Sequence, residues 1–154
     1  MRGDIRNGPY AGRAKEYVWS TIADAFPRNI TPTDIDGMVE INRCFFLFEG
    51  KTEGCEMDMG QRLCFERLLL SMPEGRAVVA VCTHPPLDVV DTKEIRNVVL
   101  VYRRGDGCVK KTMPPVRSSL WHVAQSFVRD AQAGALNPST WHGDYDDSPF
   151  EEVS

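Results

Sequence analysis

The chain has 154 residues, of which 42% are hydrophobic and 26% are charged, and its formal net charge is −4. This length and composition predict one compact globular domain with a sizeable core. No run of about 18 apolar residues is present, which argues against a membrane-spanning helix. The N-terminus also lacks the apolar stretch of a secretory signal.

The acidic residues are unevenly distributed along the chain. Residues 142–154 hold five of the 22 acidic residues and no lysine or arginine. Without them, 18 basic residues face 17 acidic ones, which leaves a net charge of +1. We therefore expect a near-neutral domain over residues 1–141 and an acidic C-terminal tail over residues 142–154. This balance permits nucleic-acid binding, because binding needs only a local basic surface.

The cysteines and histidines do not have the spacing of a zinc site. The five cysteines are odd in number and contain no Cys-x-x-Cys pair, and the three histidines are scattered. Zinc ligands are usually grouped in such short pairs. The pattern favours reduced thiols, and hence a cytoplasmic protein.

The first predicted elements are a helix and a β-hairpin. The helix runs from about Pro9 or Ala11 to Ala25, and Pro27 lies just past its end. Two runs of alternating residues, 34–41 and 44–51, then surround Asn42-Arg43. Alternation with β-branched and aromatic residues is typical of strands, and Asn tolerates the positive φ of a two-residue hairpin turn.

A turn at Asn42-Arg43 predicts the hairpin register. Ile41 then lies opposite Cys44, Asp36 opposite Glu49, and Asp34 opposite Lys51. Directly opposed carboxylates are destabilising, because their Cβ atoms are about 5 Å apart. A hard divalent cation would supply the missing positive charge. The other face is apolar and should pack on the core through Val39, Ile41, Cys44, Phe46 and Phe48. The alternative is an ordinary hairpin whose polar face is solvated.

These residues resemble the signature of the PD-(D/E)xK nuclease superfamily, an Asp on one strand and Glu-x-Lys on its antiparallel neighbour. Asp36 matches the first acid, and Glu49-Gly50-Lys51 matches the second element. Gly60-Gln61-Arg62, with Phe65, is similar to the Gln-bearing helix of several subfamilies. The resemblance covers about residues 9–84. Many relatives also place a Glu on the N-terminal helix, for which Glu16 is the candidate.

The resemblance implies a restriction-endonuclease-like α/β sandwich, with a mixed central β-sheet flanked by helices, that hydrolyses DNA. Asp36 and Glu49 would ligate Mg²⁺ or Mn²⁺ with the Gly50 carbonyl, and Lys51 would assist the water nucleophile. Gln61 would position Lys51 or the water. Asp34 is the alternative acid if the register slips by two residues.

Several features of the expected nuclease are left open. Small members of the superfamily come from bacteria and viruses, so a phage-type protein in the cytoplasm is the expectation. DNA is the expected partner, and the oligomeric state is open, with a homodimer among the alternatives. A non-catalytic DNA-binding or phage accessory protein that keeps the fold is the rival hypothesis.

The rest of the chain predicts one further helix, three strands and a final helix. Asp58 and Gln61 fit a capping box for a helix that ends at Met72. The nearly all-apolar run 76–83 is typical of an interior strand parallel to its neighbour. Strands over 97–104 and 108–112 follow, and Ser118 caps a helix that Gly134 ends.

Four basic residues gather around the second predicted hairpin. They are Arg103, Arg104, Lys110 and Lys111. A hairpin with such a rim is a candidate for contact with DNA phosphates. The alternative is a solvated hairpin tip.

Overall fold

The computed structural model describes residues 21–29, 32–112 and 118–141. By their contacts, the residues fall into two units, Met1–Asp34 and Ile35–Ser154. The single domain expected over residues 1–141 stays a prediction, and the acidic tail lies outside the described residues. No helix in the described parts of the chain has the length and apolar character needed to cross a membrane.

The described part of the first unit contains two 3-10 turns, Ala23–Ala25 and Pro27–Asn29. The sequence predicted the end of an α-helix at Ala25, and the rest of that helix lies outside the described residues. Phe26 is extended, with φ −105° and ψ 145°. Pro27 accounts for this, because a proline disfavours the helical conformation of the residue before it.

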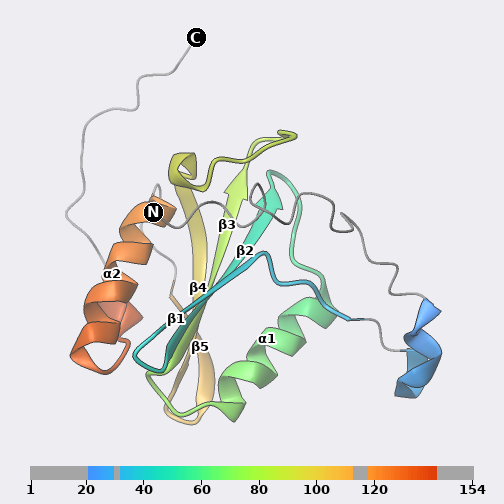
Figure 1. Ribbon diagram of the computed structural model, residues 1–154, viewed down its shortest axis with the longest axis horizontal. Coiled ribbons are helices and arrows are strands. Elements are labelled where there is room, and N and C mark those ends of the chain that lie inside the picture. Colours follow the sequence, from blue (N-terminus) through green and yellow to red (C-terminus); the bar gives the residue numbers. More distant parts are fainter. Residues whose placement is uncertain (1–20, 30–31, 113–117, 142–154) are drawn as a thin grey trace, which may run out of the picture. The chain divides into compact units, whose positions relative to one another are not determined.

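The second unit is α/β and contains a mixed sheet of five described strands in the order β1-β2-β3-β4-β5 (Figure 1). The strands are β1 (Gly37–Ile41), β2 (Cys44–Thr52), β3 (Ala77–His84), β4 (Asn97–Gly105) and β5 (Cys108–Thr112). β2 and β3 are parallel, as predicted, and the other neighbours are antiparallel. Helix α1 (Met59–Ser71) connects β2 to β3, and α2 (Leu120–Ala133) follows β5. Short 3-10 helices occur at Thr92–Glu94 and Pro138–Thr140.

The predicted hairpin register is confirmed within the strands. Ile41 pairs with Cys44, and Val39 pairs with Phe46. Asn42 and Arg43 have φ values of 51° and 62°. Two consecutive positive φ values are the mark of a type I′ turn, whose twist matches that of the strands.

The two helices cover opposite faces of the sheet (Figure 1). The α2 face holds one apolar cluster, which includes Cys44, Phe46, Val78, Cys82, Val123 and Phe127. The α1 face holds a second, which includes Leu47, Phe65, Leu69, Val79, Val81 and Tyr102.

The predicted core face of the hairpin is confirmed except at Val39, because Cys44 and Phe46 are buried and Ile41 and Phe48 pack against the same cluster. The alternative of a solvated polar face does not hold for Leu47 and Glu49, which are only 1% and 4% exposed. Leu47 packs in the cluster that contains Phe65 and Leu69 of α1. Conversely, Val39 was expected in the core but is 50% exposed. Val39 belongs to β1, which is an edge strand of the sheet.

The predicted cap residues of the two helices are confirmed, except that the N-cap of α2 is one residue later than predicted. The Asp58 carboxylate accepts a hydrogen bond from the Gln61 backbone N–H at 2.8 Å, as a capping box requires. In α2 the cap is Ser119 rather than Ser118, and its hydroxyl accepts from the His122 N–H at 3.1 Å. Gly134 ends α2 with φ 98°, a conformation that favours glycine.

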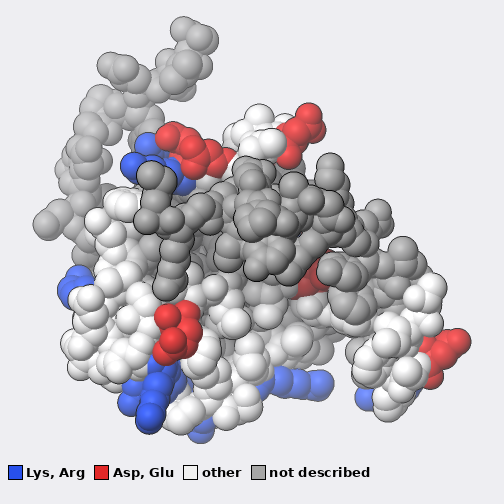
Figure 2. All heavy atoms as spheres, in the orientation of Figure 1, with Lys and Arg blue, Asp and Glu red and all other residues white. Residues whose placement is uncertain are grey.

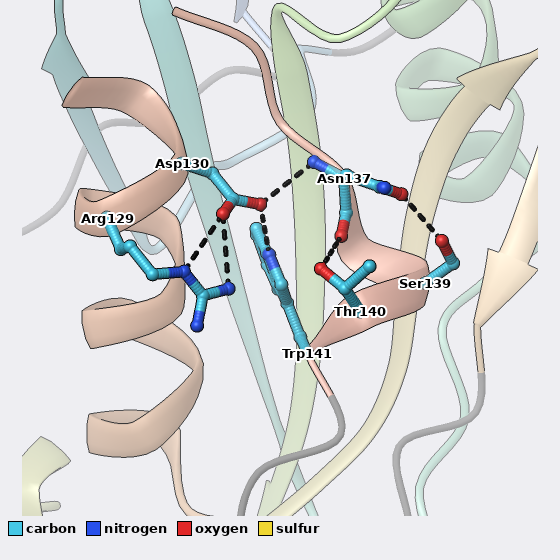
Figure 3. Close-up of polar contacts among 6 residues, drawn as sticks. All are labelled: Arg129, Asp130, Asn137, Ser139, Thr140 and Trp141. Atoms are coloured by element: carbon cyan, nitrogen blue, oxygen red, sulfur yellow. Dashed lines mark hydrogen bonds and ion pairs between the residues drawn. The ribbon is translucent and has the colours of Figure 1, made fainter. Parts of the chain in front are cut away.

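A buried carboxylate that the sequence did not indicate fixes the segment after α2 (Figure 3). Asp130 accepts hydrogen bonds from the Asn137 N–H at 2.9 Å and from Trp141 Nε1 at 2.5 Å. Its other oxygen accepts from the Arg129 guanidinium. Trp141 is thereby held in the core at 5% exposure.

Candidate functional site

The candidate site lies where the parallel strands β2 and β3 end. Glu49 is level with Val81, and Lys51 is level with Thr83. By strand alternation, Glu49 and Lys51 share the α1 face with the buried Leu47. The crossover from β2 starts α1 near this end, since Arg104 at the far end of β4 bonds the last carbonyls of α1.

Glu49 is a buried carboxylate with one satisfied oxygen. Its Oε1 lies 2.8 Å from Lys51 Nζ, and the two side chains are 5% and 21% exposed. Its Oε2 is also buried and has no hydrogen-bond partner among the described residues. A buried charged oxygen without a donor is costly, so this position favours a donor, a water or a cation.

Asp36 lies just before β1 and does not pair with Glu49 in the ladder. The strand pairing ends at Gly37 opposite Phe48. The Asp36 Oδ2 instead accepts a hydrogen bond from the Gly50 N–H at 2.7 Å. A short acidic side chain can take a backbone donor in this way and so compete with strand pairing. Asp36 and one oxygen of Glu49 thus have partners within the chain, and Oε2 of Glu49 is the carboxylate atom left without one among the described residues.

Gly50 is the point at which two strand ends and the Asp36 segment converge. A Cβ at Gly50 would lie 3.5 Å from Asp36 Oδ2, 3.5 Å from His84 Cδ2 and 3.2 Å from Phe48 Cζ. A side chain at this position would therefore press on the Phe48 ring, which favours glycine at this point beside a carboxylate and an imidazole. Gly50 lies within β2, and in an extended strand the N–H and C=O of one residue point to the same side, so the Gly50 carbonyl is on the Asp36 side.

Gln61 is buried in the first turn of α1, with 7% exposure. One turn further on, Phe65 packs into the cluster on the α1 face. Gln61 therefore lies at the same end of the sheet as Glu49 and Lys51. Its backbone role in the helix cap is shown, whereas its role beside Lys51 stays a prediction.

The four basic residues of the second hairpin lie at the other end of the sheet. Arg103 pairs with Lys110 across the hairpin and with Val78 on β3, five residues before Thr83. At about 3.3 Å per residue, this places them about 17 Å along the strands from the level of Lys51. Figure 2 shows lysine and arginine side chains at the lower end of the view, where β4 turns into β5.

Most of these basic groups have partners in the fold. Arg104 Nη1 donates to the carbonyls of Leu70 and Met72 at 3.0 and 2.6 Å. Lys110 pairs with Asp106, and this hydrogen bond holds the pKa of the Asp106 carboxyl below its usual value. Lys111 Nζ lies 5.6 Å from the centre of the Tyr102 ring. Strand alternation puts Arg103 and Lys110 on one face and Arg104 and Lys111 on the other.

The position of two further candidate acids relative to Asp36 and Glu49 stays a prediction. Asp34 belongs to the first unit, and Glu16 lies outside the described residues. Across residues 21–29, 32–112 and 118–141, no group of three or more His, Cys, Asp or Glu side chains is placed to hold a metal ion. All five cysteines are free thiols, and burial raises the pKa of Cys82 to about 12.

Comparison of the chain with protein-family models, with curated proteins and with solved structures finds no match.

Proposed function

We propose that the protein is a metal-dependent nuclease that hydrolyses DNA phosphodiester bonds through Asp36, Glu49 and Lys51. The observation that carries the proposal is the buried Glu49 carboxylate, which has one oxygen on Lys51 and the other without a donor among the described residues. A hard divalent cation suits such an oxygen, because its positive charge balances a carboxylate that burial separates from water. The adjacent Gly50 N–H holds the second carboxylate, Asp36.

The connectivity supports the restriction-endonuclease-like sandwich that the resemblance implies. Asp36 precedes one strand of an antiparallel hairpin, and Glu49-Gly50-Lys51 lies on the other. A helical crossover then leads to a strand parallel to β2. This order of hairpin, helix and parallel strand agrees with the core that such nucleases share.

Each residue of the site has a distinct role in the proposal. Asp36, Glu49 and the Gly50 carbonyl would hold Mg²⁺ or Mn²⁺, which polarises a phosphate and lowers the pKa of a bound water. The Lys51 ammonium is held beside Glu49 and is still 21% exposed, so a substrate can reach it. It would orient the attacking water or balance the charge that develops on the phosphoryl oxygens. Gln61 would position the Lys51 side chain.

The second hairpin is a secondary DNA contact in this proposal. Arg103, Lys110 and Lys111 would reach phosphates remote from the cleaved bond, because they lie at the other end of the sheet. Contacts of this kind add affinity without sequence preference. Arg104 contributes least, since its guanidinium already bonds the end of α1.

The test incubates the purified protein with linear, circular, single-stranded and branched DNA in the presence of Mg²⁺ or Mn²⁺. Asp36→Asn keeps an oxygen for the Gly50 N–H but removes the charge, and Glu49→Gln does the same at the buried site. We expect each to slow cleavage by at least about 100-fold, as loss of a key electrostatic group does. EDTA should abolish cleavage.

The matched control is Asp88→Asn, which changes an exposed acid in the loop after β3. It should cleave like the wild type. Cleavage of no substrate, or equal cleavage by all variants, would refute the nuclease proposal.

The second candidate is a non-catalytic DNA-binding or phage accessory protein with the same fold. Two observations favour it. Asp36 and Glu49 each have a partner within the chain, and the described residues contain no group of three acidic, His or Cys ligands. DNA binding that is unchanged by EDTA and by Asp36→Asn, with no cleavage, would establish this candidate over the first.

A further inference from the structure

A row of polar side chains crosses three strands beside Glu49. Lys51 on β2 is level with Thr83 on β3, and Thr83 is level with Asn97 on β4. Alternation places all three on the α1 face, one step beyond Glu49 and Val81. With neighbouring strands about 4.8 Å apart, the row is about 10 Å long.

An irregularity in the sheet puts Asn97 into this row. Val81 pairs with Leu100, but the next residue, Cys82, pairs with Val98. Val99 lies between these two pairs as an extra residue, which is a β-bulge. Without it, the apolar Val98 would be the residue opposite Thr83. Bulges are common next to active sites, where they redirect a side chain.

A hydrogen bond within the row shows which of its groups donates and which accepts. Asn97 Nδ2 donates to Thr83 Oγ1 at 2.6 Å. Because the Thr83 hydroxyl accepts this bond, its own proton is directed toward another acceptor. Asn97 has a second amide N–H, and Lys51 has an ammonium group with three donors. The row therefore presents donors from three adjacent strands, beside a lysine already oriented by Glu49.

We infer that Thr83 and Asn97 join Lys51 in binding the phosphate oxygens of a DNA strand that crosses the ends of β2, β3 and β4. The inference deepens the proposed function and rests on it for the choice of DNA as the ligand. Phosphate oxygens accept hydrogen bonds only, and hydroxyl, amide and lysine groups are among their common partners. The row supplies these three types of donor and contains no carboxylate.

The test measures the affinity of a fluorescent single-stranded DNA oligonucleotide in EDTA, so that no cleavage occurs. Thr83→Val keeps the shape of the side chain and removes the hydroxyl, and Asn97→Ala removes the amide. We expect each to weaken binding about tenfold, as the loss of a hydrogen bond to a charged group does. Thr83→Ser should restore the wild-type affinity, since it retains the hydroxyl.

Thr52→Val is the matched control. Thr52 is at the same end of β2 but pairs with His84, so alternation directs it to the α2 face. It should bind like the wild type. Thermal unfolding of every variant verifies that the fold is retained, and competition with inorganic phosphate separates strand binding from the binding of a lone anion.

The outcomes separate this inference from the proposed function. If Asp36→Asn abolishes cleavage while Thr83→Val and Asn97→Ala bind normally, the nuclease stands and the inference is wrong. If no DNA is cleaved but Thr83→Val still weakens binding and Thr83→Ser restores it, the inference stands and the nuclease proposal is wrong. Equal loss of affinity in Thr83→Val and Thr52→Val would also overturn the inference.

Discussion

The charged side chains at the two ends of the sheet differ in how their hydrogen bonds are satisfied. At the end of the β4–β5 hairpin, Arg104 bonds the Leu70 and Met72 carbonyls at the end of α1, and Lys110 pairs with Asp106, so these charges have partners within the fold. At the other end, Glu49 is buried with one oxygen on Lys51, and its other oxygen has no donor in the part of the chain that the structure describes. Among the described residues, the buried Arg103 Nε at the first end also lacks a partner, so what distinguishes the candidate site is that its unpartnered atom belongs to a buried carboxylate beside a lysine.

The largest effect that we expect from this contrast is on stability. Lys51→Met should lower the free energy of unfolding by about 3 kcal/mol, because it leaves a buried carboxylate without its partner. Lys110→Met removes an equally basic side chain from an exposed pair, and it should change stability little. Urea denaturation followed by circular dichroism measures both.

A double variant sharpens this prediction. Glu49→Gln combined with Lys51→Met removes both charges, so it should be more stable than Lys51→Met alone. Equal stability of the Lys51→Met and Lys110→Met proteins would contradict the contrast between the two ends.

A smaller effect is expected at the basic end. Arg104→Gln should lower the free energy of unfolding by about 1–2 kcal/mol, because it loses a cation and its hydrogen bonds at the carboxyl end of α1. DNA affinity should change little, since the guanidinium already binds α1. Thermal unfolding and the oligonucleotide titration measure the two properties. Weaker DNA binding at unchanged stability would instead identify Arg104 as a phosphate contact.

The sequence predicted the elements whose cause is local. Alternation around Asn42-Arg43 sets the hairpin register, since Asn accepts the positive φ of the turn. Asp58 identifies the start of α1 because its side chain bonds a backbone N–H three residues on. The cap of α2 was misplaced by one residue, because Ser118 and Ser119 carry the same hydroxyl.

The partners of the site residues could not be read from the sequence. Where β1 begins decides whether Asp36 pairs across the hairpin or bonds the Gly50 N–H. The bulge that brings Asn97 beside Thr83 cannot be predicted from the run of valines in which it occurs. Asp130 and Trp141 meet only after the chain turns back beyond α2. Each of these contacts depends on tertiary geometry.

The most direct test of the central claim is calorimetric titration of the protein with Mn²⁺. Glu49 Oε2 has no hydrogen-bond donor among the described residues. If this oxygen is a cation ligand, the wild type binds Mn²⁺, and Glu49→Gln and Asp36→Asn lose that binding. Glu56→Gln, which changes an exposed acid in the loop between β2 and α1, should bind Mn²⁺ like the wild type. Absence of Mn²⁺ binding in the wild type, or binding that Glu49→Gln leaves unchanged, would contradict the claim.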